Sequence, residues 1–278
     1  MRFRLLLERT SKPGFIPINY QYELSAAIYR IIDQGDSNFA RYLHNTGYVV
    51  DNKPFRLFTF SRLNFEGYKI HKENGRIEHV GLNATLTVSF LIDKAAEEFI
   101  KGVFLKASLY IGDKISGAHY TIRLVEAQAP AYFSETMHYT CISPVLLKRK
   151  RITGGEDYLS PTHQEFTKIL ISNLLNKARA FTTTVNTSLL WEDHAEIAFK
   201  TKGEIKKNGV TLKAFTPEAT KMIAYIFDFE LTMPTYLHEI GYHAGFGHLN
   251  SQGFGCVEVN EESYQKTLKS LEKYCVES

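Results

Sequence analysis

The chain has 278 residues, 44% of them hydrophobic, and carries a formal net charge of +3 at pH 7. This length predicts one large or two modest domains with substantial hydrophobic cores. The small net charge excludes a uniformly basic surface, so any anion-binding site must come from local patches.

The cysteines and the N-terminal segment indicate the compartment. Cys141, Cys256 and Cys275 are scattered and odd in number, and no Cys-x-x-Cys pair occurs. Neither a disulfide framework nor a thiolate metal site is therefore expected. The apolar run within residues 1–9 is far too short for a signal peptide or a membrane span. We expect a cytoplasmic protein without a membrane partner.

The first half of the chain alternates strand and helix patterns. Asp36 and Asp93 are suited to cap helices, Tyr42 is expected to face inward, and Asn74-Gly75 predicts a hairpin turn. The order strand, helix, strand, strand, helix, strand is typical of a ferredoxin-like domain. The predicted strands are residues 2–8, 55–61 and 82–92, with further strands within 107–126, and the predicted helices are residues 24–35, 36–44 and 93–101.

The second half repeats this order. A strand at 137–142 precedes a helix from Pro161, and two strands are predicted to turn at Asn208-Gly209. A helix is predicted from Thr216, followed by a strand at 256–259. The fold class is therefore α+β, with tandem ferredoxin-like (RRM-like) domains and a short C-terminal helix. The predicted boundaries are 1–127 for the first domain, 132–260 for the second and 261–278 for the helical extension.

A glycine-rich loop at residues 245–255 separates two Gly-Phe-Gly triplets by five residues that are mostly polar. Glycine permits positive φ and close approach of another backbone, and backbone N–H groups in such loops bind phosphates. The two phenylalanines can anchor the loop to a core or stack on a base. The loop leads into a strand, which argues against a dinucleotide-binding fingerprint. A surface loop without a ligand is the alternative.

Two basic clusters could contact phosphates. Open sheets of ferredoxin-like domains bind single-stranded RNA through aromatic side chains and loops, and basic residues bind its backbone. Each cluster taken alone is more typical of a solvated loop, whereas both clusters together with the glycine-rich loop favour RNA binding. The first is in a predicted loop and the second at the predicted hairpin tip: Lys148, Arg149, Lys150 and Arg151, and Lys206 and Lys207.

The histidines near the glycine-rich loop do not form a zinc motif. His238 and His243 are five residues apart, whereas a zinc-binding helix needs two histidines four apart on one face. His243 and His248 flank or lie in the loop, where they could contact RNA or be ordinary loop histidines. We expect no metal site and no cofactor.

Together these segments resemble the CRISPR-associated endoribonucleases that cut precursor CRISPR RNA within its repeats. The loop matches the family signature, in which two Gly-hydrophobic-Gly triplets are separated by five residues. Residues 24–30, 42–44, 57–61 and 141–145 are also similar to that family. The resemblance implies two ferredoxin-like domains, CRISPR repeat RNA (single-stranded or hairpin) in or beside the cleft between them, and metal-independent cleavage. An effector complex or a homodimer stays open as a further partner. The implied RNA-binding positions in the loop are Gly245, Gly247, His248, Gly253 and Gly255.

The resemblance also implies the catalytic residues. Tyr29 and His44 fall at the family's catalytic tyrosine and histidine, and either Lys53 or Arg56 fills a third, cationic role. A base would take the proton of the ribose 2′-hydroxyl and an acid would protonate the leaving 5′-oxygen, giving a 2′,3′-cyclic phosphate and a 5′-hydroxyl. From their positions alone, Tyr29 could instead be a half-buried helix residue and His44 a helix cap. A non-cleaving RNA-binding subunit of a CRISPR effector complex is the alternative function.

Overall fold

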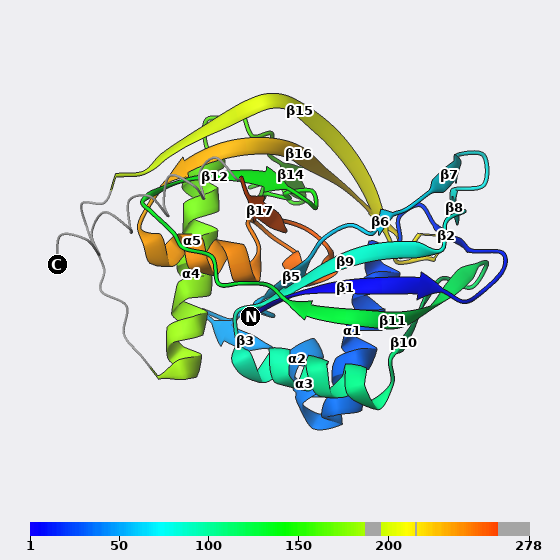
Figure 1. Cartoon of the computed structure of the whole chain (residues 1–278). Coiled ribbons are helices and arrows are strands. Elements are labelled where there is room, and N and C mark those ends of the chain that lie inside the picture. Colours follow the sequence, from blue (N-terminus) through cyan, green and yellow to red (C-terminus); the bar gives the residue numbers. More distant parts are fainter. Residues whose placement is uncertain (187–195, 215, 261–278) are drawn as a thin grey trace.

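The computed structural model describes residues 1–186, 196–214 and 216–260, and its two main sheets are antiparallel with helices on their faces (Figure 1). The helical extension predicted at 261–278 lies outside the described residues. Among the described helices, none has the length and apolar character needed to cross a membrane.

The first sheet is built around the N-terminal strand. Its strand order is β10-β11-β1-β9-β5, and β6 also pairs with β9. Three helices cover one face of this sheet (Figure 1). The bounds are β1 Arg2–Arg9, β5 Phe58–Phe60, β6 Asn64–Phe65, β9 Asn83–Phe90, β10 Ser108–Gly112 and β11 Gly117–Ala127, with α1 Gln21–Gly35, α2 Ser37–Asn45 and α3 Asp93–Leu105.

The second sheet repeats the arrangement. Its order is β15-β16-β12-β17, so the first and third strands of each βαββαβ unit are central neighbours in both sheets. The bounds are β12 Thr136–Cys141, β15 Ala198–Leu212, β16 Thr220–Thr232 and β17 Val257–Val259, with α4 Phe166–Val185 and α5 Thr235–Ala244. These two units are the tandem ferredoxin-like arrangement predicted from the sequence.

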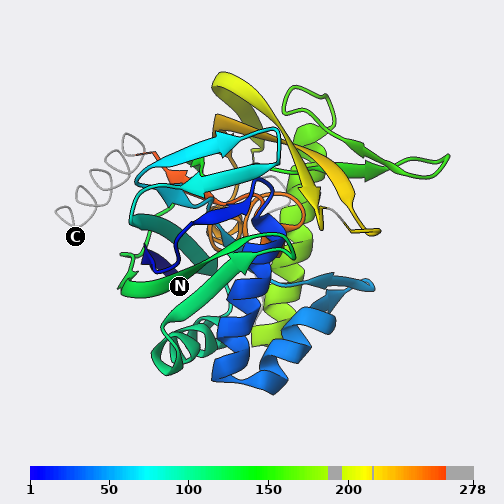
Figure 2. The ribbon, with the colours of Figure 1, turned by 90° about the vertical axis from the view of Figure 1, so that its right-hand side faces the viewer.

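Several short strands pair outside the two main sheets. Figure 2 shows the β13–β14 hairpin, in green, extending from the right-hand side of the molecule. A 3-10 helix, η1 (Asn250–Gln252), lies within the glycine-rich loop. The remaining strands are β2 Phe15–Pro17, β7 Tyr68–His71 and β8 Arg76–His79 in one sheet, β3 Tyr48–Val50 with β4 Lys53–Phe55, and β13 Lys148–Lys150 with β14 Glu156–Tyr158.

One hydrophobic core runs through both units, and polar contacts of Arg2 join them across the chain. The Arg2 guanidinium is buried; it donates to the Val257 carbonyl at 2.8 Å and to Gln128 Oε1 at 2.6 Å, and it stacks 4.3 Å from the Tyr242 ring centre. Residues from β1 to β17 belong to the same buried cluster. The two units therefore form one packed body.

Several local predictions for the first half are confirmed. The Asp36 carboxylate accepts a hydrogen bond from the Phe39 N–H at 3.0 Å, which caps α2 as expected. Asn74-Gly75 lies in the turn between β7 and β8. The predicted stripe of α1 is buried: Leu24, Ala27, Ile28, Ile31 and Ile32.

Three local predictions for the first half are wrong. The segment 55–61 is not one strand: Phe55 ends β4 and residues 58–60 form β5, because Leu57 adopts φ 52° and interrupts the extended chain between them. Tyr42 is 40% exposed instead of facing inward. The cap of α3 is Ile92, and the Asp93 side chain makes no capping hydrogen bond.

The largest errors lie in the second half. Asn208-Gly209 is in the middle of β15, paired with Ala224 and Ile223, and not in a turn. The segment predicted as a helix from Thr216 is strand β16. The second helix of this unit is α5, which the sequence patterns did not predict. A register shift opposite residues 202–206 changes the phase of the buried positions of β16, which imitates helical spacing.

Candidate active site between the two domains

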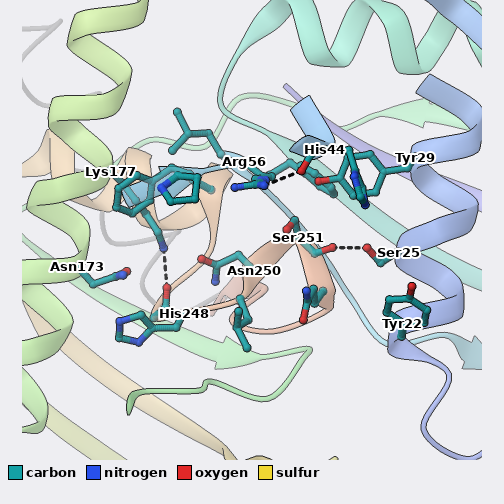
Figure 3. A pocket seen from close by; sticks show the side chains of 18 of the residues that line it. Tyr22, Ser25, Tyr29, His44, Arg56, Asn173, Lys177, His248, Asn250 and Ser251 are labelled. Carbon is teal, nitrogen blue, oxygen red and sulfur yellow. Dashed lines mark hydrogen bonds between the residues drawn. The ribbon is translucent and has the colours of Figure 1, made fainter. Parts of the chain in front are cut away.

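A cavity of about 590 Å³ lies between the two units (Figure 3). The N-terminal unit contributes α1, the end of α2 and residues 54–58, and the C-terminal unit contributes Lys148, α4 and the glycine-rich loop. A volume of this size suits a ligand such as part of a nucleotide chain, since binding pockets typically span about 300–1,000 Å³.

Tyr29 and His44 meet on one wall of the cavity. Their ring centres are 5.1 Å apart in an edge-to-face contact, and Tyr29 packs in the same way against Phe58 at 5.5 Å. Burial raises the pKa of the Tyr29 phenol, while the nearby Arg56 charge acts in the opposite direction. The phenol therefore keeps its proton near neutral pH and can donate a hydrogen bond.

Arg56 is fastened to the end of the helix that carries His44. Its guanidinium donates to the His44 carbonyl at 2.6 Å, where the C-terminal end of α2 leaves carbonyl groups free. The positive φ of Leu57 turns the chain directly after Arg56. Lys53, in contrast, is exposed on β4 and does not line the cavity. The structure brings Tyr29, His44 and Arg56 together and leaves Lys53 outside.

The glycine-rich loop forms the floor of the cavity. All four glycines of its triplets have positive φ, between 74° and 88°. A Cβ atom on Gly255 would lie 1.9 Å from the Phe246 carbonyl oxygen, so only glycine fits there. Phe246 and Phe254 are fully buried. The phenylalanines therefore anchor the loop to the core rather than stacking on a base.

The floor is tied to both units. The Ser25 hydroxyl donates to the Ser251 carbonyl at 2.6 Å, and Thr59 donates to the Phe254 carbonyl at 3.0 Å. His248 donates its backbone N–H to Leu146 and lines the cavity. These contacts hold the loop against the wall that carries the tyrosine and the histidine.

Two buried polar side chains of α4, Asn173 and Lys177, complete the opposite wall, and the sequence reasoning missed both. The Lys177 ammonium donates to the carbonyls of Gly245 and Gly247, the latter at 2.8 Å. Burial lowers the pKa of Lys177 well below its ordinary value. The sequence offered one signal for them: Asn173 and Lys177 lie one helical turn apart beside the apolar stripe of α4, where polar side chains become buried.

The basic run 148–151 is not a solvated loop. It forms β13 and the following turn, and it faces the acidic strand β14. Lys148 pairs with Glu156 at 2.7 Å, Arg151 pairs with Asp157 at 2.6 Å, and Arg149 contacts both Asp157 and Glu165. Of this run, Lys148 lines the cavity.

The second basic cluster lies outside the cavity. Lys206 and Lys207 are exposed on the long edge strand β15, so their prediction as a hairpin tip is wrong. Lys206 also pairs with Glu204 at 3.3 Å.

The histidines of α5 have structural contacts. His238 is fully buried, with Nδ1 2.9 Å from the Tyr139 hydroxyl and Nε2 2.9 Å from the Glu135 carbonyl. His243 lies 3.1 Å from the Ser89 hydroxyl of β9. Across the part of the chain that the structure describes, no three His, Cys, Asp or Glu side chains gather as a metal-ligand set.

Two family models match nearly the whole chain. "CRISPR-associated protein Cas6, N-terminal" matches residues 15–126, and "CRISPR associated protein Cas6, C-terminal" matches residues 126–259. The chain is 30% identical to "CRISPR-associated endoribonuclease Cas6 1" of Methanocaldococcus jannaschii, over 97% of this chain and 96% of that protein. It is 25% identical to "CRISPR-associated endoribonuclease Cas6" of Pyrococcus furiosus, over 98% and 95%.

Solved structures have the same fold. A structure described as a Cas6-related gene from Pyrococcus furiosus aligns with TM-score 0.75 and 19% identity, covering 94% of this chain and 99% of that one. A second, described as CRISPR associated protein Cas6, aligns with TM-score 0.70 and 26% identity over the same shares.

Proposed function

The chain belongs to the Cas6 family of CRISPR-associated endoribonucleases, and from that membership we propose that Tyr29, His44 and Arg56 carry out the cleavage. The protein processes precursor CRISPR RNA into guide RNAs as an endoribonuclease. The observation that carries the assignment is the meeting of Tyr29, His44 and the tethered Arg56 on one wall of the interdomain cavity.

The chemistry needs a nucleophile that the RNA itself supplies. The 2′-hydroxyl attacks the adjacent phosphorus and the bond to the 5′-oxygen breaks, which leaves a 2′,3′-cyclic phosphate and a 5′-hydroxyl. His44 is the member of the trio that we propose as the proton-transfer group, because histidine is the side chain that most often serves as a general acid or base. The Tyr29 phenol, kept protonated by burial, donates a hydrogen bond to the scissile phosphate.

Arg56 stabilises the charge that develops on the phosphorane. Its guanidinium cannot lose its proton, and the hydrogen bond to the His44 carbonyl fixes its position before RNA arrives. Charge stabilisation by a positioned donor is typically worth about 10²–10³-fold in rate. On the opposite side of the cavity, Lys148, His248 and the glycine-rich loop are the RNA contacts that we propose.

The mechanism is tested by cleavage of a repeat RNA in excess EDTA. We expect the wild-type rate to persist, and we expect a single 2′-deoxy substitution at the cleaved nucleotide to abolish the reaction. Loss of activity in EDTA that returns with a divalent ion would contradict the mechanism. A protein that binds the RNA tightly but never cuts it would instead be the non-cleaving subunit.

A further inference from the structure

The amide of Asn173 is a buried polar group in the cavity to which the cleavage mechanism gives no role. The residue is 7% exposed and lines the cavity, yet its Oδ1 atom has no hydrogen-bond partner among the described residues. Burying an acceptor without a partner typically costs 1–3 kcal/mol. Such a group calls for a partner that the chain itself does not contain.

The amide faces the cavity from the side opposite the catalytic trio. Figure 3 shows Asn173 on α4, across the pocket from Tyr29 and His44, with Lys177, Asn250 and His248 around it. A group bound at Asn173 therefore lies in the same cavity as the scissile phosphate but away from it.

The surroundings of Asn173 are rigid and favour a nucleotide. Lys177, one helical turn further along α4, is held by the carbonyls of Gly245 and Gly247. Asn250 is fixed by hydrogen bonds from its Nδ2 to the carbonyls of Phe246 and Phe254. Among the described residues, Lys177 forms no ion pair with a carboxylate, and an RNA phosphate bound nearby would favour the charged form of this buried amine.

We propose that this end of the cavity is a nucleobase subsite, in which Asn173 reads an adenine or a cytosine a few nucleotides from the cleaved bond. The inference rests on the proposed function and adds a determinant of repeat specificity to it. The amide oxygen accepts from the exocyclic amine, and the amide nitrogen donates to the adjacent ring nitrogen. Both bases carry this donor–acceptor pair on one edge.

Uracil fits the recessed acceptor less well. Its N–H donor lies between two carbonyl oxygens, so when one of them accepts from the Asn173 amide nitrogen, the other lies beside the Asn173 oxygen and repels it. An exocyclic amine projects from the base edge and reaches the Asn173 oxygen without that repulsion. The subsite therefore discriminates by the amine.

The test uses a repeat RNA with every single-base change at the five nucleotides on each side of the cut. Single-turnover cleavage measures the rate, and binding of the same RNAs with a 2′-deoxy nucleotide at the cut measures affinity without chemistry. For the wild-type protein we expect one position, away from the cut, where uracil in place of the amino base costs roughly tenfold or more.

Asn173→Ala should reduce that discrimination to within about threefold, while preferences at all other positions stay unchanged. Asn173→Asp presents two acceptors and should shift the preference at that position toward guanine, which offers two adjacent donors. The matched control is Asn176→Ala, on the same helix but outside the cavity, and it should leave every preference intact.

Thermal unfolding distinguishes base recognition by Asn173 from a role in stabilising the fold. Because the Asn173 oxygen has no hydrogen-bond partner within the described chain, Asn173→Ala should melt at or above the wild-type temperature. Wild-type base preferences retained by Asn173→Ala, or a clear loss of its stability, would overturn the proposal. A wild-type protein that does not cleave overturns the proposed function instead, and the binding measurements still decide the base subsite.

Discussion

The position of His44 at the end of α2 explains how the three proposed catalytic residues meet. His44 sits in the last turn of α2, so its backbone carbonyl is available to Arg56 while its ring contacts Tyr29. One residue thus positions a cation through its backbone and, in the mechanism that we propose, exchanges a proton through its side chain.

The choice between the two candidate cations gives the first prediction. Arg56→Ala should slow single-turnover cleavage by roughly 10²-fold, because the charge beside the phosphorane is lost. Lys53→Ala should leave the rate within about threefold, since Lys53 is exposed and outside the cavity. The two variants are measured on the same repeat RNA, and equal losses in both would show that Arg56 is not the cation.

The second prediction concerns His44. Its side chain is exposed, so His44→Ala should fold normally and keep RNA affinity within a few-fold. The single-turnover rate should fall by roughly 10²-fold or more, because proton transfer is lost. Tyr29→Phe should slow cleavage less than His44→Ala does. If His44→Ala cleaves at the wild-type rate, the proton-transfer role belongs to another side chain.

At the scale of elements, the β13–β14 hairpin places the basic run 148–151 opposite acidic residues, so that its side chains form ion pairs. Lys148, Arg149 and Arg151 each face a carboxylate of the same hairpin or its neighbourhood. A phosphate must compete with these partners, so the run contributes less to binding than its sequence indicates. Lys150 is exposed, and Lys148 lines the cavity.

The third prediction compares the two basic clusters. Replacing Lys148 and Lys150 by Gln should flatten the log–log salt dependence of binding to single-stranded RNA by about 0.7 per lost contact. Replacing Lys206 and Lys207 by Gln should leave the slope unchanged, because both lie on β15 outside the cavity. Filter binding across a salt series measures both. A change from the Lys206 and Lys207 variant alone would place the RNA on β15 instead.

The elements also show what the sequence could predict. The βαββαβ order of the first half and the α1 stripe followed from local patterns, because each depends on contacts that repeat along the chain. For the second half the predicted order was right, but its third strand and its second helix were misplaced. Strand β16 was mistaken for a helix because a register shift across from it altered its alternation. Asn173 and Lys177 could not be assigned, since their roles depend on a loop about 70 residues away in the chain.

At the scale of the whole molecule, buried histidines make stability depend on pH. Burial lowers the pKa of His238 to about 4, below its unfolded value of about 6.5. The unfolded chain therefore binds the proton first. The stabilisation is fully present above about pH 6.5 and is lost as the pH falls toward 4.

The fourth prediction follows from this shift. When the pH falls from 7 to 5, the lowered pKa of His238 should reduce the free energy of unfolding by about 2 kcal/mol. Urea unfolding at the two pH values measures the change, and His238→Gln should reduce it by that amount. The exposed His119→Gln variant is the control and should keep the wild-type difference. A wild-type difference in His238→Gln would mean that other groups cause the acid sensitivity.

The buried Arg2 has a consequence for how the protein is made on the ribosome. Its partners Gln128 and Val257 are translated long after it, and Val257 comes 129 residues after Gln128. At 5–20 residues per second, the nascent first half waits roughly 10 s for its last partner. During that interval a cationic side chain destined for the interior stays in water. The buried contact between Arg2 and β17 can therefore form only after that strand has been translated.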